Sequence, residues 1–161
     1  MKRELKKKYA QLVEIMNTKT LMKNPPVSGL LKCFEIMMSE EEADFLLAIG
    51  DKKVAYEELR SYYKGSDANW EKFIYGIMNK GMIWLTWHED GSCTGEMAPI
   101  FPGWIEVSLS DGKKTPEKIK LAKKFSQLLV LKRKLNIWPL RRIFLKKYNE
   151  KMASENAPIT M

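Results

Sequence analysis

The side chains most able to do chemistry in this chain are two cysteines and a single histidine: Cys33, Cys93 and His88. The cysteines are 60 residues apart with no second ligand beside either, so their spacing matches no zinc or iron–sulfur motif. His88 precedes Glu89 and Asp90 in an expected turn, with no partner for a catalytic or metal site nearby. We therefore predict two free thiols in a reducing compartment, no metal and no cofactor.

Motifs for other kinds of catalysis are equally scarce. We find no glycine-rich phosphate loop, no paired carboxylates in a catalytic context and no Ser/Cys–His arrangement. No run of about 18 apolar residues could span a membrane, and the basic N-terminus is not followed by an apolar signal segment. The sequence thus predicts a cytoplasmic protein that is not an enzyme.

The charges along the 161 residues are segregated, although the chain as a whole carries +8. Residues 1–38 carry a net +5, residues 39–112 a net −8 and residues 113–161 a net +11. We predict three parts with these bounds: a basic N-terminal helical extension, a compact domain, and a basic C-terminal helical extension with a tail. A DNA-binding surface needs cations against the phosphates, so the acidic middle part is poorly suited to that role.

The middle part has the element order of a winged helix-turn-helix. Ser39-Glu40-Glu41-Glu42 forms a capping box that starts a helix, and Gly50 ends it. A second helix is expected over residues 53–63, and a third begins at Ser66 or Asp67 and ends at Gly81. The expected core positions of this third helix are Trp70, Phe73, Ile74, Ile77 and Met78. A β-hairpin over residues 82–97, with its turn at residues 89–92, completes a mainly α fold with a small β-hairpin.

The flanking segments are expected to add helices at both ends. Apolar residues recur at helical spacing over residues 2–16, and residues 27–38 form a further short apolar element. Trp104 is assigned to the core rather than to a ligand groove. Thr115 and Pro116 open a helix whose apolar stripe (Ile119, Ala122, Phe125, Leu128, Leu129 and Leu135) is expected to pack on the winged-helix body. A last basic helix is expected over residues 140–148.

Three segments of the middle part carry a resemblance to a known family. Residues 38–43 (MSEEEA), 78–84 (MNKGMIW) and 101–106 (FPGWIE) together resemble the N-terminal winged-helix region of ferredoxin-type iron–sulfur proteins of anaerobic bacteria and archaea. The resemblance covers residues 38–112, less than half of the chain. Such proteins continue into a cysteine-rich cluster-binding half, whereas this chain has no C-x-x-C. The resemblance therefore implies a winged-helix fold and an anaerobic redox setting, but no cluster.

Two surfaces are candidates for binding. In the basic C-terminal part, cations alternate with aromatic residues, and the partner-binding candidates are Trp138, Arg141, Arg142, Lys146 and Lys147. This part could be a solvated face, or bind an acidic protein, nucleic acid or, least favoured, a membrane surface; it could also fold back on the acidic body. The outward positions of the third helix are the candidates for DNA binding: Asn69, Lys72, Tyr75, Asn79 and Lys80.

The leading interpretation is a non-catalytic accessory or regulatory module that docks on a protein partner, such as a subunit of an anaerobic redox enzyme. The alternative is a DNA-binding transcriptional regulator that uses the third helix and the wing. That helix has no arginine on its outward face, and Glu71 there would repel phosphate. The sequence does not determine whether the chain forms homo-oligomers.

Overall fold

The computed structural model describes residues 2–20, 23–110 and 112–134. It confirms a mainly helical chain with a small antiparallel sheet of three strands, ordered β1-β3-β2. The elements are α1 (Arg3–Thr18), α2 (Ser28–Met37), α3 (Glu40–Ile49), β1 (Lys53–Ala55), α4 (Tyr56–Tyr62), α5 (Asp67–Asn79), β2 (Ile83–Trp87), β3 (Cys93–Met97), the π-helical turn η1 (Ile100–Trp104), α6 (Ile105–Ser110) and α7 (Pro116–Lys134).

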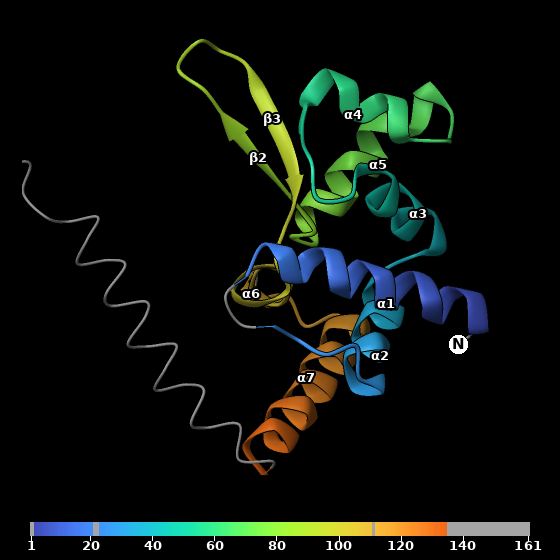
Figure 1. Cartoon of the computed structure of the whole chain (residues 1–161), viewed down its shortest axis with the longest axis vertical. Helices are drawn as coiled ribbons and strands as arrows, with labels where there is room; N and C mark the ends of the chain where they lie inside the picture. Colours follow the sequence, from blue (N-terminus) through green and yellow to red (C-terminus); the bar gives the residue numbers. More distant parts are fainter. Residues whose placement is uncertain (1, 21–22, 111, 135–161) are drawn as a thin grey trace, which may run out of the picture.

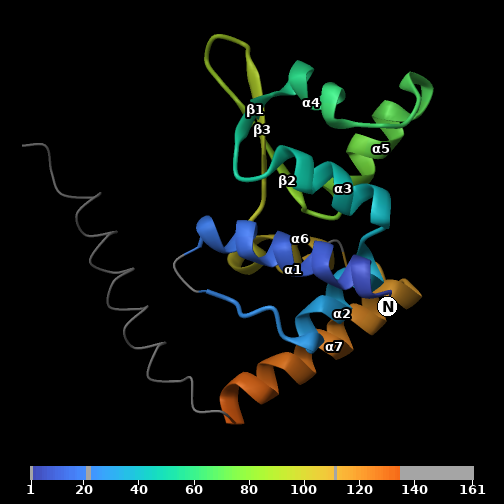
Figure 2. The ribbon, with the colours of Figure 1, turned by 45° about the vertical axis from the view of Figure 1, so that its right-hand side comes forward.

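The elements gather at two ends of an elongated molecule. Helices α3, α4 and α5 lie with the sheet at one end, α2 and α7 lie at the other, and α1 crosses between them (Figures 1 and 2). One cluster of buried side chains nevertheless runs through both ends. The three parts distinguished by charge therefore share a continuous hydrophobic core.

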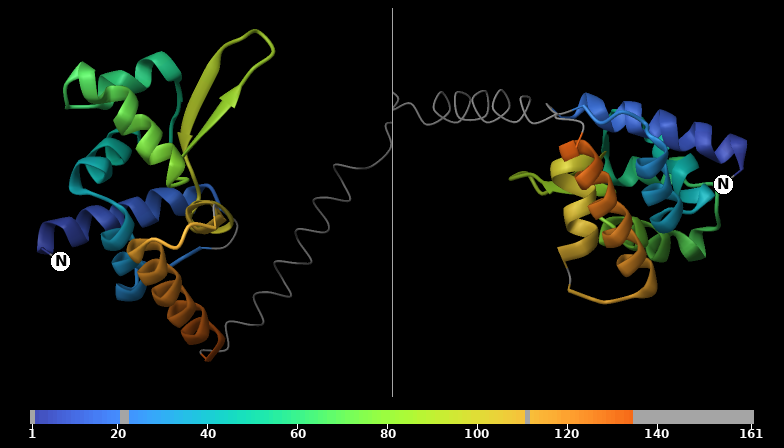
Figure 3. Two further views of the ribbon diagram at one scale, coloured as in Figure 1. Left: turned by 180° about the vertical axis from the view of Figure 1, so that it is seen from behind. Right: turned by 90° about the horizontal axis from the view of Figure 1, so that it is seen from below.

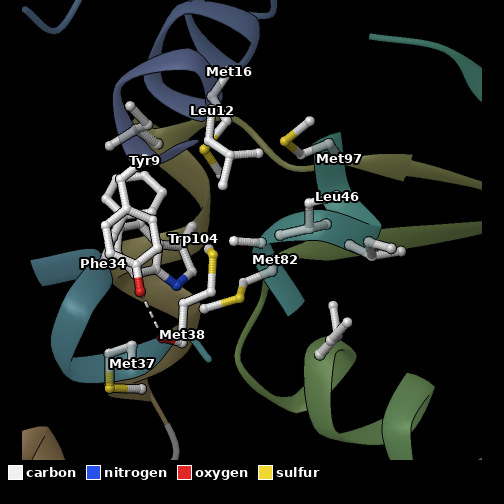
Figure 4. Close-up of a cluster of buried hydrophobic side chains, with 14 of the residues drawn as sticks. Tyr9, Leu12, Met16, Phe34, Met37, Met38, Leu46, Met82, Met97 and Trp104 are labelled. Carbon is white, nitrogen blue, oxygen red and sulfur yellow. Dashed lines mark hydrogen bonds between the residues drawn. The ribbon is translucent and has the colours of Figure 1, made fainter. Parts of the chain in front are cut away.

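The centre of this core is built from α1, α2 and η1 around Trp104 (Figure 4). Trp104 is fully buried, as predicted, and its ring lies 4.5 Å from that of Phe34. Tyr9 packs on the other side of Phe34 at 5.7 Å and donates a hydrogen bond of 2.8 Å to the Met38 carbonyl. The polar end of Tyr9 thus fixes α1 against the segment that leads into α3.

Local signals predicted the ends of several elements. The capping box of α3 is present, with the Glu42 amide donating to Ser39 Oγ at 3.2 Å and the Ser39 amide donating to Glu42 Oε2 at 2.8 Å. Gly50 follows α3 with a φ of 67°. The hairpin pairs Ile83 with Met97 and Trp87 with Cys93, as its turn sequence indicated. These features depend on neighbouring residues and were therefore visible in the sequence.

The expectation of a helix from residue 53 was wrong at its start. Lys53–Ala55 forms β1, which pairs antiparallel with β3 and places Val54 opposite Gly95. Val54 is buried while its two neighbours are exposed, which is the alternation of a strand. A partner about 40 residues away thus overrides the local helical pattern.

The packing expected for α7 was only partly right. This helix lies on α2, with further contacts to α6, rather than on the elements at the opposite end of the molecule. Leu121 and Leu128 are buried, whereas Ile119 is 56% exposed and Leu129 is 46% exposed. Apolar residues cover more than one face of α7, so their periodicity did not decide which face would be buried. The helix expected over residues 140–148 lies outside the described residues.

Gly81 is required where α5 ends against α6. Its φ is 69°, and a Cβ placed there would lie 2.4 Å from Val107 Cβ. Gly91 in the hairpin turn has a φ of 82° but would meet no atom within 4 Å. Both glycines therefore have a positive φ, but only Gly81 is sterically crowded.

We predict that Gly81→Ala lowers the free energy of unfolding more than Gly91→Ala does. Both variants incur about 1–2 kcal/mol for the left-handed backbone, and only Gly81→Ala adds about 1–3 kcal/mol of overpacking against Val107. Urea denaturation of the two variants measures the difference. Equal losses would show that α6 does not depend on this close approach.

A second prediction concerns alkaline pH. Burial is the largest cause that raises the pKa of Tyr9 to about 12, and the carboxylates of Glu35, Glu42 and Glu40 add to it. The folded chain holds this proton more tightly than the unfolded chain does, so the contribution of Tyr9 to stability is complete below about pH 10 and is lost as the pH rises towards 12.

The stability of the wild-type chain should accordingly fall across this alkaline range, and Tyr9→Phe should show a shallower fall because it has no proton to lose. Tyr9→Phe should also be less stable at neutral pH by about 1–3 kcal/mol, since the Met38 carbonyl loses its donor. Denaturant titrations at a series of pH values test both effects. An unchanged slope in Tyr9→Phe would exclude Tyr9 as the titrating group.

Candidate functional site

The candidate site is an open groove between α5 and β2, with a volume of about 770 Å³. Three of its aromatic side chains are largely exposed: Tyr75 at 55%, Trp84 at 41% and Trp87 at 71%. The complete lining is Tyr56, Tyr75, Met78, Ile83, Trp84, Leu85, Thr86 and Trp87. Exposed clusters of large apolar side chains mark interaction surfaces, and aromatic residues are enriched at protein interfaces.

Two periodicities place these side chains at the groove. On α5, Glu71, Tyr75 and Met78 are spaced i, i+4 and i+7, so they share one face of the helix. On β2, successive side chains alternate between the two faces, so Trp87 shares the face of Ile83 and Leu85, whereas Trp84 leaves the strand on the opposite side and lies at the edge of the groove. A short strand with a tryptophan on each face cannot bury both of them in a small sheet.

The groove has an acidic edge. The pKa of the Tyr56 hydroxyl is raised first by burial, and then by the neighbouring Tyr75, Glu71, Cys93 and Glu57. Two carboxylates, on α4 and α5, therefore lie close enough to this tyrosine to disfavour a further negative charge. The groove suits a ligand that is apolar and positively charged.

The five DNA-binding candidates do not form one cationic surface. Asn69, Lys72 and Asn79 are exposed on α5, whereas Tyr75 lines the groove. The Lys80 ammonium lies 2.6 Å from Glu42 Oε1 and 2.8 Å from Glu42 Oε2.

Lys72 is then the only basic residue within α5, and it directly follows Glu71. Arg60 on the neighbouring α4 is also engaged: its guanidinium pairs with Asp67 and donates to the Tyr63 carbonyl at 2.9 Å. The cations of this region thus mostly serve structural ion pairs and hydrogen bonds.

The partner-binding candidates of the C-terminal part, Trp138, Arg141, Arg142, Lys146 and Lys147, lie outside the described residues. Tyr56, Trp84 and Trp87 of the groove were not predicted as site residues. The signal that could have found them is the sequence Ile-Trp-Leu-Thr-Trp of β2, which combines a short strand with two bulky aromatic residues.

The structure places both thiols in buried positions and the histidine on the surface. Burial raises the pKa of the Cys33 thiol to about 11, despite the opposing effect of Lys124, and Cys33 Sγ donates to the Gly29 carbonyl at 3.4 Å. Burial is also the largest cause that raises the pKa of Cys93, so both thiols are protonated at neutral pH. His88 lies on the exposed hairpin with its Nε2 2.9 Å from Thr94 Oγ1.

Two further searches concern metals and membranes. Among residues 2–20, 23–110 and 112–134, no three His, Cys, Asp or Glu side chains converge as a metal site. No helix in this part of the chain has the length and apolar character needed to cross a bilayer.

Comparison with models of protein families, with curated proteins and with solved structures finds no match to this chain. Its function therefore has to be inferred from its own surfaces.

The pairing of Lys80 predicts a structural rather than a DNA-binding role. Lys80→Met keeps the aliphatic stem but leaves the largely buried Glu42 carboxylate without its cation, so it should lower the free energy of unfolding by about 1–3 kcal/mol. Lys72→Met is the matched control on an exposed site and should change stability by less than about 0.5 kcal/mol. Thermal or urea denaturation compares them, and equal stabilities would contradict this role.

Proposed function

We propose that the chain is a non-catalytic accessory module whose winged-helix core docks on a protein partner through the groove between α5 and β2. The observation that carries the proposal is the exposure of Tyr75 and Trp87 in a groove that also contains Tyr56, the tyrosine whose pKa the carboxylates of Glu57 and Glu71 help to raise. Exposed aromatic side chains supply much of the energy of protein interfaces when a partner covers them. An acidic edge attracts a basic partner and repels phosphate.

The order of elements supports the winged-helix part of the proposal. Three helices are interleaved with strands in the order α3, β1, α4, α5, β2 and β3, and β3 lies between the other two strands. In this interpretation α4 and α5 are the helix-turn-helix pair, and β2 and β3 form the wing. The groove then lies between the third helix and the wing.

Electrostatics favours a protein over DNA as the partner. A DNA reader gains affinity by neutralising phosphates, and its commonest specific contact is an arginine on guanine. On α5 the single cation, Lys72, is next to Glu71, while Lys80 is paired with Glu42. A DNA-binding regulator would therefore depend on the basic flanking parts for most of its affinity.

The resemblance of residues 38–112 to the winged-helix region of ferredoxin-type iron–sulfur proteins supports one setting for the partner. In that setting the partner is a subunit of an anaerobic redox enzyme, and this chain contributes binding without a cluster or any other cofactor of its own.

The decisive experiment compares surface variants in the native host. The tagged chain should recover a stoichiometric protein partner, and the double variant Tyr75→Ala/Trp87→Ala should reduce recovery at least tenfold, since loss of an aromatic anchor costs about 2 kcal/mol or more. Both side chains are largely exposed, so the melting temperature should change little. Lys72→Ala is the control and should retain the partner.

Loss of the partner in Lys72→Ala but not in the double variant would contradict docking in the groove. A salt titration of duplex DNA binding tests the alternative directly. A steep inverse dependence of affinity on salt, with a sequence preference that Lys72→Ala and Asn79→Ala abolish, would establish a DNA-binding regulator instead.

A further inference from the structure

The groove defines the chemistry of its ligand. Its aromatic lining favours apolar and aromatic side chains, and the carboxylates of Glu57 and Glu71 favour cations next to them. A segment with this chemistry occurs in the chain itself. Residues 135–148 (LNIWPLRRIFLKKY) contain Trp138, four further aromatic or large apolar residue types (Leu, Ile, Phe and Tyr) and four cations, without any Asp or Glu.

We propose that the groove of one copy of the chain binds residues 135–148 of a second copy. The proposal rests on one part of the proposed function, namely that the groove is a protein-docking surface, and it names a second copy of the chain as the occupant. Charge complementarity supports it, because residues 135–148 carry four cations and no carboxylate, whereas the carboxylates of Glu57 and Glu71 lie near Tyr56 of the groove.

The position of α7 favours a second copy over the same chain. The C-terminal end of α7 lies at the opposite end of the molecule from the β2–β3 hairpin, as Figures 1 and 2 and the left view of Figure 3 show. The 19 residues of α7 span about 28 Å and lead away from the sheet. Trp138 follows Lys134 by only four residues, which cover at most about 14 Å. Trp138 therefore cannot return along α7 to the groove of its own chain.

Pairing of two grooves face to face is disfavoured, because each would bring Glu57 and Glu71 against the same residues of the other copy. Exchange of the C-terminal segments avoids this repulsion, since each groove then meets cations. When two copies exchange segments reciprocally, each groove is filled by the segment of the other copy, and the result is a closed dimer.

The test uses full-length chains with complementary defects. The groove variant is Tyr75→Ala/Trp87→Ala, and the segment variant reverses Arg141, Arg142, Lys146 and Lys147 to glutamate. Sedimentation equilibrium should show the wild type, of 18.8 kDa, as a dimer and each variant alone as a monomer at the same concentration. The Kd of self-association should rise at least tenfold in each variant.

Mixing the two variants provides the strongest result. The groove variant still carries an intact segment, and the segment variant still carries an intact groove, so an equimolar mixture should form a heterodimer through one remaining contact. A matched control that reverses the exposed Lys120 and Lys123 of α7 should leave the wild-type dimer unchanged. The single variant Trp87→Glu should also be monomeric. This result would show that the loss of the dimer does not depend on misfolding of the double variant.

A monomeric wild type, a dimer that survives in either variant, or a mixture that stays monomeric would each overturn the proposal. These results leave the proposed function standing if the double variant still loses its partner in the native host. Conversely, a dimer with complementation but no partner in the host would support the exchange of segments and refute the accessory role.

Discussion

Burial of Trp104 is the interaction on which the arrangement of the other elements depends. Its ring packs on Phe34 of α2, and Phe34 packs in turn on Tyr9 of α1, so a series of tilted aromatic contacts joins α1, α2 and η1. The indole Nε1 has no hydrogen-bond partner within the described part of the chain. An unpaired buried donor costs about 1–3 kcal/mol, which the apolar area of a fully buried tryptophan offsets.

Because of this shared core, the N-terminal part is not a separate extension of the body. Helix α1 contributes Tyr9, Leu12 and Met16 to the same cluster that contains the sheet residues Ile83 and Met97. Ion pairs reinforce the connection, because Lys19 at the end of α1 lies 2.7 Å from Glu96 on β3. The N-terminal part therefore stabilises the body of the molecule, and its cations are not all available to a partner.

At the end of the molecule that contains α4, α5 and the sheet, the distribution of charge and the exposed aromatic side chains support the same interpretation. Lys80 and Arg60 are held by Glu42 and Asp67, which leaves the carboxylates of Glu57 and Glu71 near the aromatic groove. The same arrangement that weakens a DNA-binding interpretation supports the proposal that the groove binds a basic, aromatic segment. The proposed protein docking and the proposed exchange of C-terminal segments both rest on this one distribution of charge.

The sequence by itself determined the features that depend on neighbouring residues. The buried face of α1, the capping box of Ser39 and Glu42, the end of α3 at Gly50 and the turn of the hairpin all follow from spacing or from backbone preference within a few residues. Charge segregation is likewise a property of the sequence, and with it the weakness of α5 as a DNA-binding surface.

Only the tertiary structure decided features that need a distant partner. Val54 joins a strand because β3 lies beside it, Leu121 and Leu128 are buried because α7 meets α2, and Lys80 is neutralised because Glu42 lies across from α5. The aromatic groove belongs to the same class, since Tyr75 and Trp87 come together only when α5 packs beside β2. Periodicity shows that a helix or strand has an apolar or charged face. Which other element that face packs against is determined by the packing of elements distant in sequence.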